Sequence, residues 1–174
     1  MKRGYAPIQY SLLSPDEAPL MFGVHHHRAT QDHFDLRLEC GSFAHSWVLP
    51  EGPSLYPKHV REAIRVKDHA KKCLGTEGRI PTGFRGAGPI LLWDKGTYLP
   101  SLASNSSPEE SIELGLQQGC LHLTFRGEKL LGAWLLVRRR TGWLFQKLRD
   151  AHASDLDVLR LDRSVLTGRQ IGDL

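Results

Sequence analysis

The residues best suited to chemistry lie on one short segment in which polar and apolar side chains alternate. The run His33-Phe34-Asp35-Leu36-Arg37-Leu38-Glu39 alternates without a break, which is typical of a half-buried β-strand. Successive side chains of a strand point to opposite faces. We therefore expect His33, Asp35 and Arg37 to project together while the apolar residues turn to the core.

A further histidine, His27, precedes this segment by six residues and is expected to fold back beside His33. Two imidazoles and a carboxylate are a familiar donor set for a divalent transition metal with open coordination positions. The spacing thus predicts a metal site made by His27, His33 and Asp35. The neighbouring His25 and His26 offer the same donor atoms, so the choice among the three histidines stays open at this point.

Arg37 lies one step further along the same expected face. A guanidinium group there suits a bidentate contact to two phosphate oxygens. The combination favours chemistry on a phosphoester beside a divalent cation. The alternative is a strand whose polar face is only solvated or hydrogen-bonded, because His-x-Asp pairs are common by chance.

The rest of the chain predicts mainly β-structure around this segment. Strands are expected over residues 42–49, 63–66, 89–93, 120–125, 129–137 and 143–148, with turns at clusters of Gly and Pro. One helix stands out, because Ser107 can cap it, Pro108 suits its first position and Gly119 can end it. These patterns predict a single-domain barrel or sandwich.

A stretch dense in glycine separates the strands expected at 63–66 and 89–93, with glycines at positions 75, 78, 83, 86 and 88. Such spacing indicates a structured loop whose backbone approaches another group closely, although an ordinary long connection would look similar. It is not a phosphate-binding P-loop, because no Gly-Lys-Ser/Thr ends it.

Length, charge and cysteine content narrow the class of protein. The chain has 174 residues, with 40% hydrophobic and 24% charged, which fits one folded domain. A net charge of +4 is compatible with nucleic acid but favours it only mildly. No apolar run approaches the ~18 residues of a membrane helix, so we expect a cytoplasmic protein without a membrane partner. A monomer is the default expectation, because the sequence carries no signal of oligomeric state. Cys40, Cys73 and Cys120 form no CxxC pair and do not fit a disulfide framework or a zinc ribbon.

Several motifs in a fixed order resemble one known family. They cover residues 22–27, 33–39, 46–54, 66–69, 77–83, 86–88 and 93–97, with weaker matches at 127–134 and 143–144 and a last one at 163–169. Together they are similar to the 3′-phosphoesterase domain of bacterial DNA ligase D, here expected as a stand-alone homologue. The resemblance divides the chain into an N-terminal arm (1–20), a phosphoesterase-like β-barrel domain (21–149) and a C-terminal extension (150–174).

The resemblance implies a manganese-dependent hydrolase that heals DNA or RNA–DNA 3′ ends in DNA repair, removing a 3′-phosphate or a terminal 3′-ribonucleotide. The implied fold is mainly β, a small antiparallel β-barrel with one or two short helices. By the matching positions, the resemblance implies that His27, His33 and Asp35 bind the metal. It implies catalytic roles for His33, Arg37, Arg61 and His69, the last three of which would also bind the phosphate. His69 would protonate the leaving oxygen or donate a hydrogen bond to the phosphate.

Four positions depart from the family pattern, one of them Ala70, where the family usually has Pro. Cys73 stands where the family usually has a Tyr of the phosphate site, Lys67 where it has Glu, and Glu51 where it often has Lys. These departures keep an alternative open, a catalytically weakened DNA-end-binding module that retains the fold and the metal site. A metal-dependent hydrolase of small molecules on a similar barrel is a third reading. No Lys-x-Asp-Gly motif occurs, so sealing an end would need a separate DNA ligase, and extending it a polymerase.

Contacts to a DNA backbone are expected from basic residues beside the proposed site, and base stacking from two aromatic residues. Phe84 is a candidate for stacking on a base, whereas Trp93, within an apolar strand, fits the core better. The basic candidates are Lys58, Arg61, Lys71, Lys72, Arg79 and Arg85.

Overall fold

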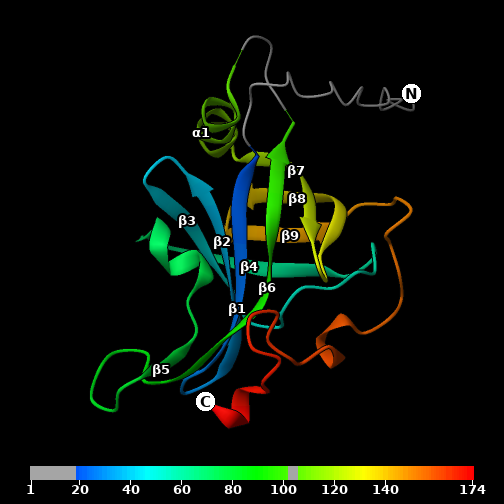
Figure 1. The fold of residues 1–174 in the computed structure, drawn as a ribbon. Coiled ribbons are helices and arrows are strands. Elements are labelled where there is room, and N and C mark those ends of the chain that lie inside the picture. Colours follow the sequence, from blue (N-terminus) through cyan, green and yellow to red (C-terminus); the bar gives the residue numbers. More distant parts are fainter. Residues whose placement is uncertain (1–18, 102–105) are drawn as a thin grey trace.

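A closed antiparallel β-barrel forms the body of the protein (Figure 1). The computed structural model describes residues 19–101 and 106–174. Within them the strands are β1 (Leu20–Arg28), β2 (Asp32–Cys40), β3 (Phe43–Leu49), β4 (Val60–Ala70), β5 (Gly78–Ile80), β6 (Gly88–Pro100), β7 (Cys120–Gly127), β8 (Leu131–Arg139) and β9 (Gly142–Lys147). They pair in the order β1-β2-β3-β4-β9-β8-β7-β6, and pairing of β1 with β6 closes the ring, while β5 extends the sheet from β6. The predicted small antiparallel barrel is confirmed.

Aromatic side chains fill the barrel interior. Phe125 meets Phe22 edge-on, with 4.6 Å between ring centroids, and Trp134 stacks on Phe145 at the same separation. All four rings are fully buried, as is Trp93, whose core position is confirmed. A barrel of this size is just wide enough to be filled by side chains. Polar chemistry therefore has to lie on the outer face of the barrel or at its ends.

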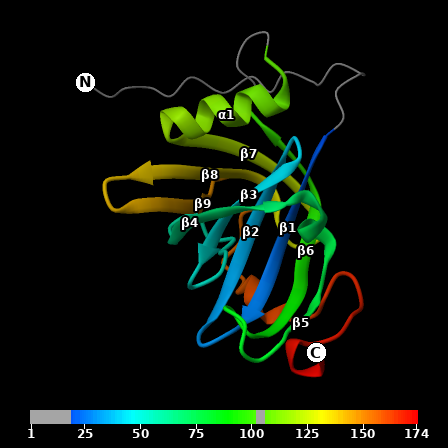
Figure 2. The same cartoon turned by 90° about the vertical axis from the view of Figure 1, so that its left-hand side faces the viewer.

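One α-helix, α1 (Pro108–Gln118), crosses one end of the barrel beside β7 (Figure 2). Ser107 and Glu110 form a reciprocal capping box at its start, and Gly119 ends it in a left-handed conformation with φ of 75°. Ile112 packs into the core beneath it. The helix predicted from its capping residues is confirmed. The other helical segments of the described residues are the 3₁₀ turns η1 (Lys71–Gly75), η2 (Val158–Arg160) and η3 (Ile171–Asp173).

Two strands are much longer than their sequence patterns predict. β4 covers 11 residues and β6 covers 13, because each pairs with different neighbours along its length. β4 pairs with β9 at its start and with β3 further on, and β6 pairs with β5, β1 and β7. Backbone pairing thus extends β4 and β6 into segments where polar and apolar residues do not alternate.

The residues after β9 pack back on the barrel. Val158 and Ile171 are buried in the hydrophobic core, and the Glu77 carboxylate accepts hydrogen bonds from Ser164 and Thr167. The region predicted as an N-terminal arm falls almost entirely on residues 1–18, outside the described residues, and β1 begins at Leu20. Within the described ranges, no helix combines the length and apolar character needed to cross a membrane.

A buried carboxylate on β6 organises the turn between β7 and β8. Asp94 is fully buried and accepts hydrogen bonds from the backbone N–H groups of Glu128, Lys129 and Leu130. These bonds hold residues 128–130 in the turn, so β8 starts at Leu131 rather than at residue 129 as the sequence predicts.

Substituting Asp94→Ala should leave these backbone donors without an acceptor. We expect the free energy of unfolding to fall by about 3 kcal/mol. Urea titration followed by circular dichroism measures this change, and Asp155→Ala, at an exposed carboxylate, should stay within about 0.5 kcal/mol of the parent. A loss at Asp94 no larger than that of the control would contradict the assigned role.

Candidate metal and phosphate site

The pairing of β1 with β2 brings the predicted metal ligands together. His27 lies directly opposite His33, and their rings meet edge-on with 4.7 Å between centroids. Asp35 follows two residues later on the same face of β2, the outer face, because Leu36 is buried in the barrel. One ligand atom from each of His27, His33 and Asp35 lies within 4.8 Å of the other two. The structure therefore places the three predicted ligands in one cluster.

Backbone carbonyls fix which nitrogen of each neutral imidazole is free. His27 Nε2 lies 2.8 Å from the Gly86 carbonyl oxygen, and His33 Nδ1 lies 3.0 Å from that of Gln31. A carbonyl only accepts, so these nitrogens carry the hydrogen. The free nitrogens, His27 Nδ1 and His33 Nε2, then lie 3.9 Å and 3.6 Å from the Asp35 oxygens. Orientation of ligating histidines by such partners is usual in metal sites.

This donor set fits a divalent transition metal ion. Two imidazole nitrogens and one carboxylate oxygen leave further coordination positions for water and substrate. The side chains of His27, Asp35 and His33 are 8%, 12% and 19% exposed, so His33 forms the most open side of the cluster. Gly86 has a φ of 77°, and a Cβ there would lie 3.3 Å from His27 Cε1. The glycine-rich segment is therefore a structured loop in close contact with the cluster, as predicted.

Arg37 ties the cluster to the turn η1. Its Nη1 donates to the Cys73 carbonyl oxygen at 2.8 Å, and its Nη2 lies 3.4 Å from Asp35 Oδ2. The neighbouring position on β1 is Gly23, where a Cβ would lie 2.5 Å from the Leu74 carbonyl oxygen, so glycine is required for η1 to lie this close. Arg37 is nearly buried. It holds η1 and Asp35, and its phosphate contact stays a prediction.

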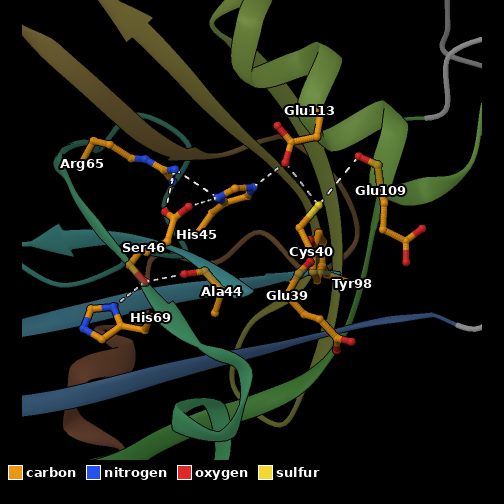
Figure 3. A network of polar contacts seen from close by, with 11 residues as sticks. Glu39, Cys40, Ala44, His45, Ser46, Arg65, His69, Tyr98, Glu109 and Glu113 are labelled. Atoms are coloured by element: carbon orange, nitrogen blue, oxygen red, sulfur yellow. Dashed lines mark hydrogen bonds and ion pairs between the residues drawn. The ribbon is translucent and has the colours of Figure 1, made fainter. Parts of the chain in front are cut away.

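His69 joins the same cluster from β4. His69 pairs with Ala44 of β3, and the register of β3 against β4 shifts between Ala44 and Ser46. The Ser46 hydroxyl donates to the Ala44 carbonyl, so Ser46 Oγ accepts the hydrogen of His69 Nδ1 at 2.9 Å (Figure 3). Burial and the positive charge of Arg37 lower the pKa of His69. His69 is therefore neutral near pH 7, and its Nε2 is the nitrogen free to meet a substrate.

Arg61 is the one predicted site residue that the structure keeps apart from the cluster. It pairs with Phe145 of β9 and shares the strand face of the buried Ala63, opposite to that of the outer-facing side chains. Its Nη1 donates to the carboxylate of Glu51. The phosphate role of Arg61 stays a prediction.

His25 also belongs to the site, although the sequence alone did not distinguish it from His26 and His27 as a candidate ligand. It lies opposite Asp35, is fully buried, and neither ring nitrogen has a hydrogen-bond partner in standard geometry. Burial, followed by the charge of Arg37, lowers its pKa to about 3. The third histidine, His26, instead stacks on Phe34 with 4.6 Å between centroids. The geometry thus favours His27 as the ligand.

Comparison with known proteins identifies the family. The chain matches the family described as the DNA Ligase D 3′-phosphoesterase domain over residues 25–138, which is more than half of its length. The chain belongs to this family. The resemblance read from its motifs is thereby confirmed, and His27, His33, Asp35, Arg37 and His69 all lie within the matched region of this phosphoesterase domain.

Relatives with this domain are much longer proteins. The chain is 37% identical over 143 residues to the multifunctional non-homologous end joining protein LigD of Pseudomonas aeruginosa, covering 79% of this chain and 16% of that protein. It is 31% identical to LigD of Mycolicibacterium smegmatis, covering 74% and 17%, and 29% identical to LigD of Mycobacterium tuberculosis, covering 74% and 16%. The chain thus spans about a sixth of the length of these relatives.

The buried His25 should make the stability of the phosphoesterase domain depend on pH. Its pKa is about 3 in the folded protein against 6.5 for an unperturbed histidine, so the unfolded chain binds the proton more tightly. Between these values the free energy of unfolding falls as the pH falls, by up to about 1.4 kcal/mol per pH unit from this group.

The variant His25→Gln removes this titration, and urea unfolding at about pH 5, 6 and 7 measures the slope. We expect a smaller slope than in the parent, whereas His152→Gln, at an exposed histidine, should keep the parent slope. Equal slopes for His25→Gln and the parent would show that folding does not lower the pKa of His25.

Proposed function

We propose that this protein is a divalent-metal-dependent phosphoesterase that heals DNA 3′ ends, removing a 3′-phosphate or a terminal 3′-ribonucleotide. The observation that carries this proposal is the cluster of His27, His33 and Asp35, in which backbone carbonyls leave one nitrogen of each imidazole free beside the carboxylate. Membership of the phosphoesterase family, together with relatives named for non-homologous end joining, supports a role in DNA repair.

The charges of the cluster suit an anionic substrate once a cation is bound. Asp35 and Arg37 balance each other, and the pKa values of His25 and His69 are lowered, so these two rings add no charge near pH 7. A divalent ion such as Mn²⁺, held by His27, His33 and Asp35, would supply Lewis-acid polarisation of a phosphoryl oxygen. The cluster then carries a positive charge that attracts a phosphate ester.

The residues of the chain have separate tasks in this proposal. Arg37 orients Asp35 and contributes positive charge where phosphoryl transfer concentrates negative charge. A phosphate bound beside His69 would raise the pKa of His69 again, because an opposite charge favours the imidazolium form. His69 Nε2 would then donate its proton to the leaving oxygen, while Ser46 holds Nδ1.

Basic and aromatic side chains flank the cluster on the two segments that cover it. Lys71 and Lys72 are exposed on η1, beside the Cys73 carbonyl that contacts Arg37. Phe84, 69% exposed, and Arg85 belong to the loop that carries Gly86. We expect DNA to approach between these segments, with phosphate contacts from the lysines and base stacking on Phe84.

A 3′-phosphorylated primer–template tests the proposal directly, with phosphate release measured in the presence of Mn²⁺ or another divalent metal. His33→Ala and Asp35→Asn should each lower the rate by about 100-fold or more, because the first removes a ligand and the second removes the negative charge of a ligand. His152→Ala, at an exposed histidine away from the cluster, should keep the parent rate. No release with any divalent metal, or full activity of His33→Ala, would reject the phosphoesterase function.

A second candidate function is binding of DNA ends without turnover. Two observations favour it. Glu51 neutralises the charge of Arg61, and Cys73 contacts Arg37 only through its backbone carbonyl. Tight binding of 3′-phosphate ends without phosphate release, and activity gained on Cys73→Tyr, would support this function over the first.

The ion pair of Arg61 with Glu51 generates a prediction for either function. Glu51→Gln frees the guanidinium and removes a negative charge, so the Kd for a 3′-phosphate DNA end should fall roughly 2- to 5-fold at low salt. Fluorescence anisotropy measures this change, and Glu62→Gln, an exposed neighbour on β4, provides the matched comparison. Equal effects of the two variants would mean that Arg61 makes no contribution to DNA binding beyond general charge.

A further inference from the structure

A second cluster of metal-ligating side chains lies where α1 meets the barrel (Figure 3). Cys40 is the last residue of β2, His45 belongs to β3 and Glu113 to α1. Cys40 Sγ lies 3.6 Å and His45 Nε2 3.0 Å from the same oxygen, Oε1 of Glu113. The three ligand atoms lie within 4.8 Å of one another. Three separate elements thus converge on one point.

Two of the distances between these atoms are close to those of a tetrahedral zinc site. Zinc binds cysteine sulfur at about 2.3 Å and histidine nitrogen or carboxylate oxygen at about 2.0 Å. At tetrahedral angles these bond lengths separate sulfur from oxygen by about 3.5 Å and nitrogen from oxygen by about 3.3 Å. The observed distances, 3.6 Å and 3.0 Å, are close to both values.

A chain of contacts orients His45 as it would a metal ligand. His45 Nδ1 lies 2.9 Å from Asp68 Oδ2, and Arg65 Nη2 donates to Asp68 Oδ1 at 2.8 Å. Arg65 in turn lies over the Trp47 ring, 4.4 Å from its centroid. With Nδ1 donating its hydrogen to Asp68, the Nε2 lone pair faces Glu113. A carboxylate on the far nitrogen of a ligating histidine is a common support of metal sites.

The alternative tautomer would block the site. Arg65 Nη2 also lies 3.0 Å from His45 Nδ1 and would donate to it if Nε2 carried the hydrogen. The Asp68 oxygen at 2.9 Å would then face the Nδ1 lone pair, which is repulsive. The first tautomer satisfies Asp68 and Arg65, and it leaves the Nε2 lone pair facing Glu113 Oε1 at 3.0 Å, a repulsive contact that a bound cation would relieve.

The surroundings carry an excess of negative charge. Glu109, Glu113 and Asp68 face a single guanidinium, that of Arg65, and the Glu109 carbonyl oxygen lies 3.8 Å from Cys40 Sγ. Burial, followed by the charge of Glu113, raises the pKa of Cys40 to about 12. Without a bound cation the Cys40 thiol is therefore protonated near neutral pH, and binding of a cation would release its proton.

We propose that Cys40, His45 and Glu113 bind a divalent transition metal ion of the zinc class, which ties α1 to β2 and β3, and that Asp68 positions His45. The site is separate from the phosphoesterase cluster. Cys40 lies on the interior face of β2 and Asp35 on the outer face, five residues or about 17 Å apart along the strand.

The test uses the full chain with the first site disabled by His33→Ala and Asp35→Asn, and titrates it with Co²⁺ and then Zn²⁺. We expect one equivalent of Co²⁺ to bind with a thiolate-to-cobalt charge-transfer absorption that Zn²⁺ abolishes. Adding Cys40→Ser should remove this absorption and weaken zinc binding by about 100-fold or more. Cys120→Ser, at another free cysteine, is the matched control and should leave both unchanged.

Two more measurements separate a metal site from a hydrogen-bonded cluster. Asp68→Asn should weaken zinc binding by about 10- to 100-fold while the absorption persists, because the ligands remain. With the first site disabled by His33→Ala and Asp35→Asn, zinc should raise the thermal midpoint of the protein, and adding Cys40→Ser, with folding verified by circular dichroism, should remove this shift. No stoichiometric binding, or an absorption unaffected by Cys40→Ser, would overturn the proposal. Either result leaves the phosphoesterase assay untouched, since that assay depends on His33 and Asp35.

Discussion

The register of β1 against β2 is the constraint on which the candidate active site depends. It sets His27 opposite His33 and His25 opposite Asp35, so two cross-strand pairs supply three of the imidazoles at the site. A slip of one residue would turn every polar side chain of β2 into the core. The apolar residues on the interior face, such as Leu36 and Leu38, make that slip costly. Packing of the barrel core thereby fixes the geometry of the polar cluster outside it.

The outer face of these strands is covered almost as fully as the inner one. Asp35 and Arg37 are both nearly buried, under η1 and the glycine-rich loop. Both covering segments approach so closely that Gly23 and Gly86 leave no room for a larger side chain without displacement. Burial keeps His25 and His69 neutral and strengthens the field of the few charges present. An exposed set of the same residues would have weaker electrostatic effects.

The sequence predicted the elements that carry a local signal. Alternation in β2 and the capping residues of α1 are short-range patterns, and both elements were predicted correctly. The full lengths of β4 and β6 depend on partners distant in sequence, which no local pattern reports. The cluster of His27, His33 and Asp35 was predictable because these residues share one hairpin. The position of Arg61 was not, since it depends on a pairing with Glu51 across a turn. His45 looked ordinary in the sequence because its partners, Asp68 and Glu113, come from β4 and α1.

The path of the last residues matters for how the protein is handled. Arg79 of β5 donates to the Leu174 carbonyl oxygen, so the chain ends beside β5, just before the loop that carries Phe84 and Gly86 (Figure 1). An affinity tag or a fluorescent fusion attached after Leu174 would sit next to the surface that we expect nucleic acid to use. β1, by contrast, begins at the opposite end of the barrel (Figure 1).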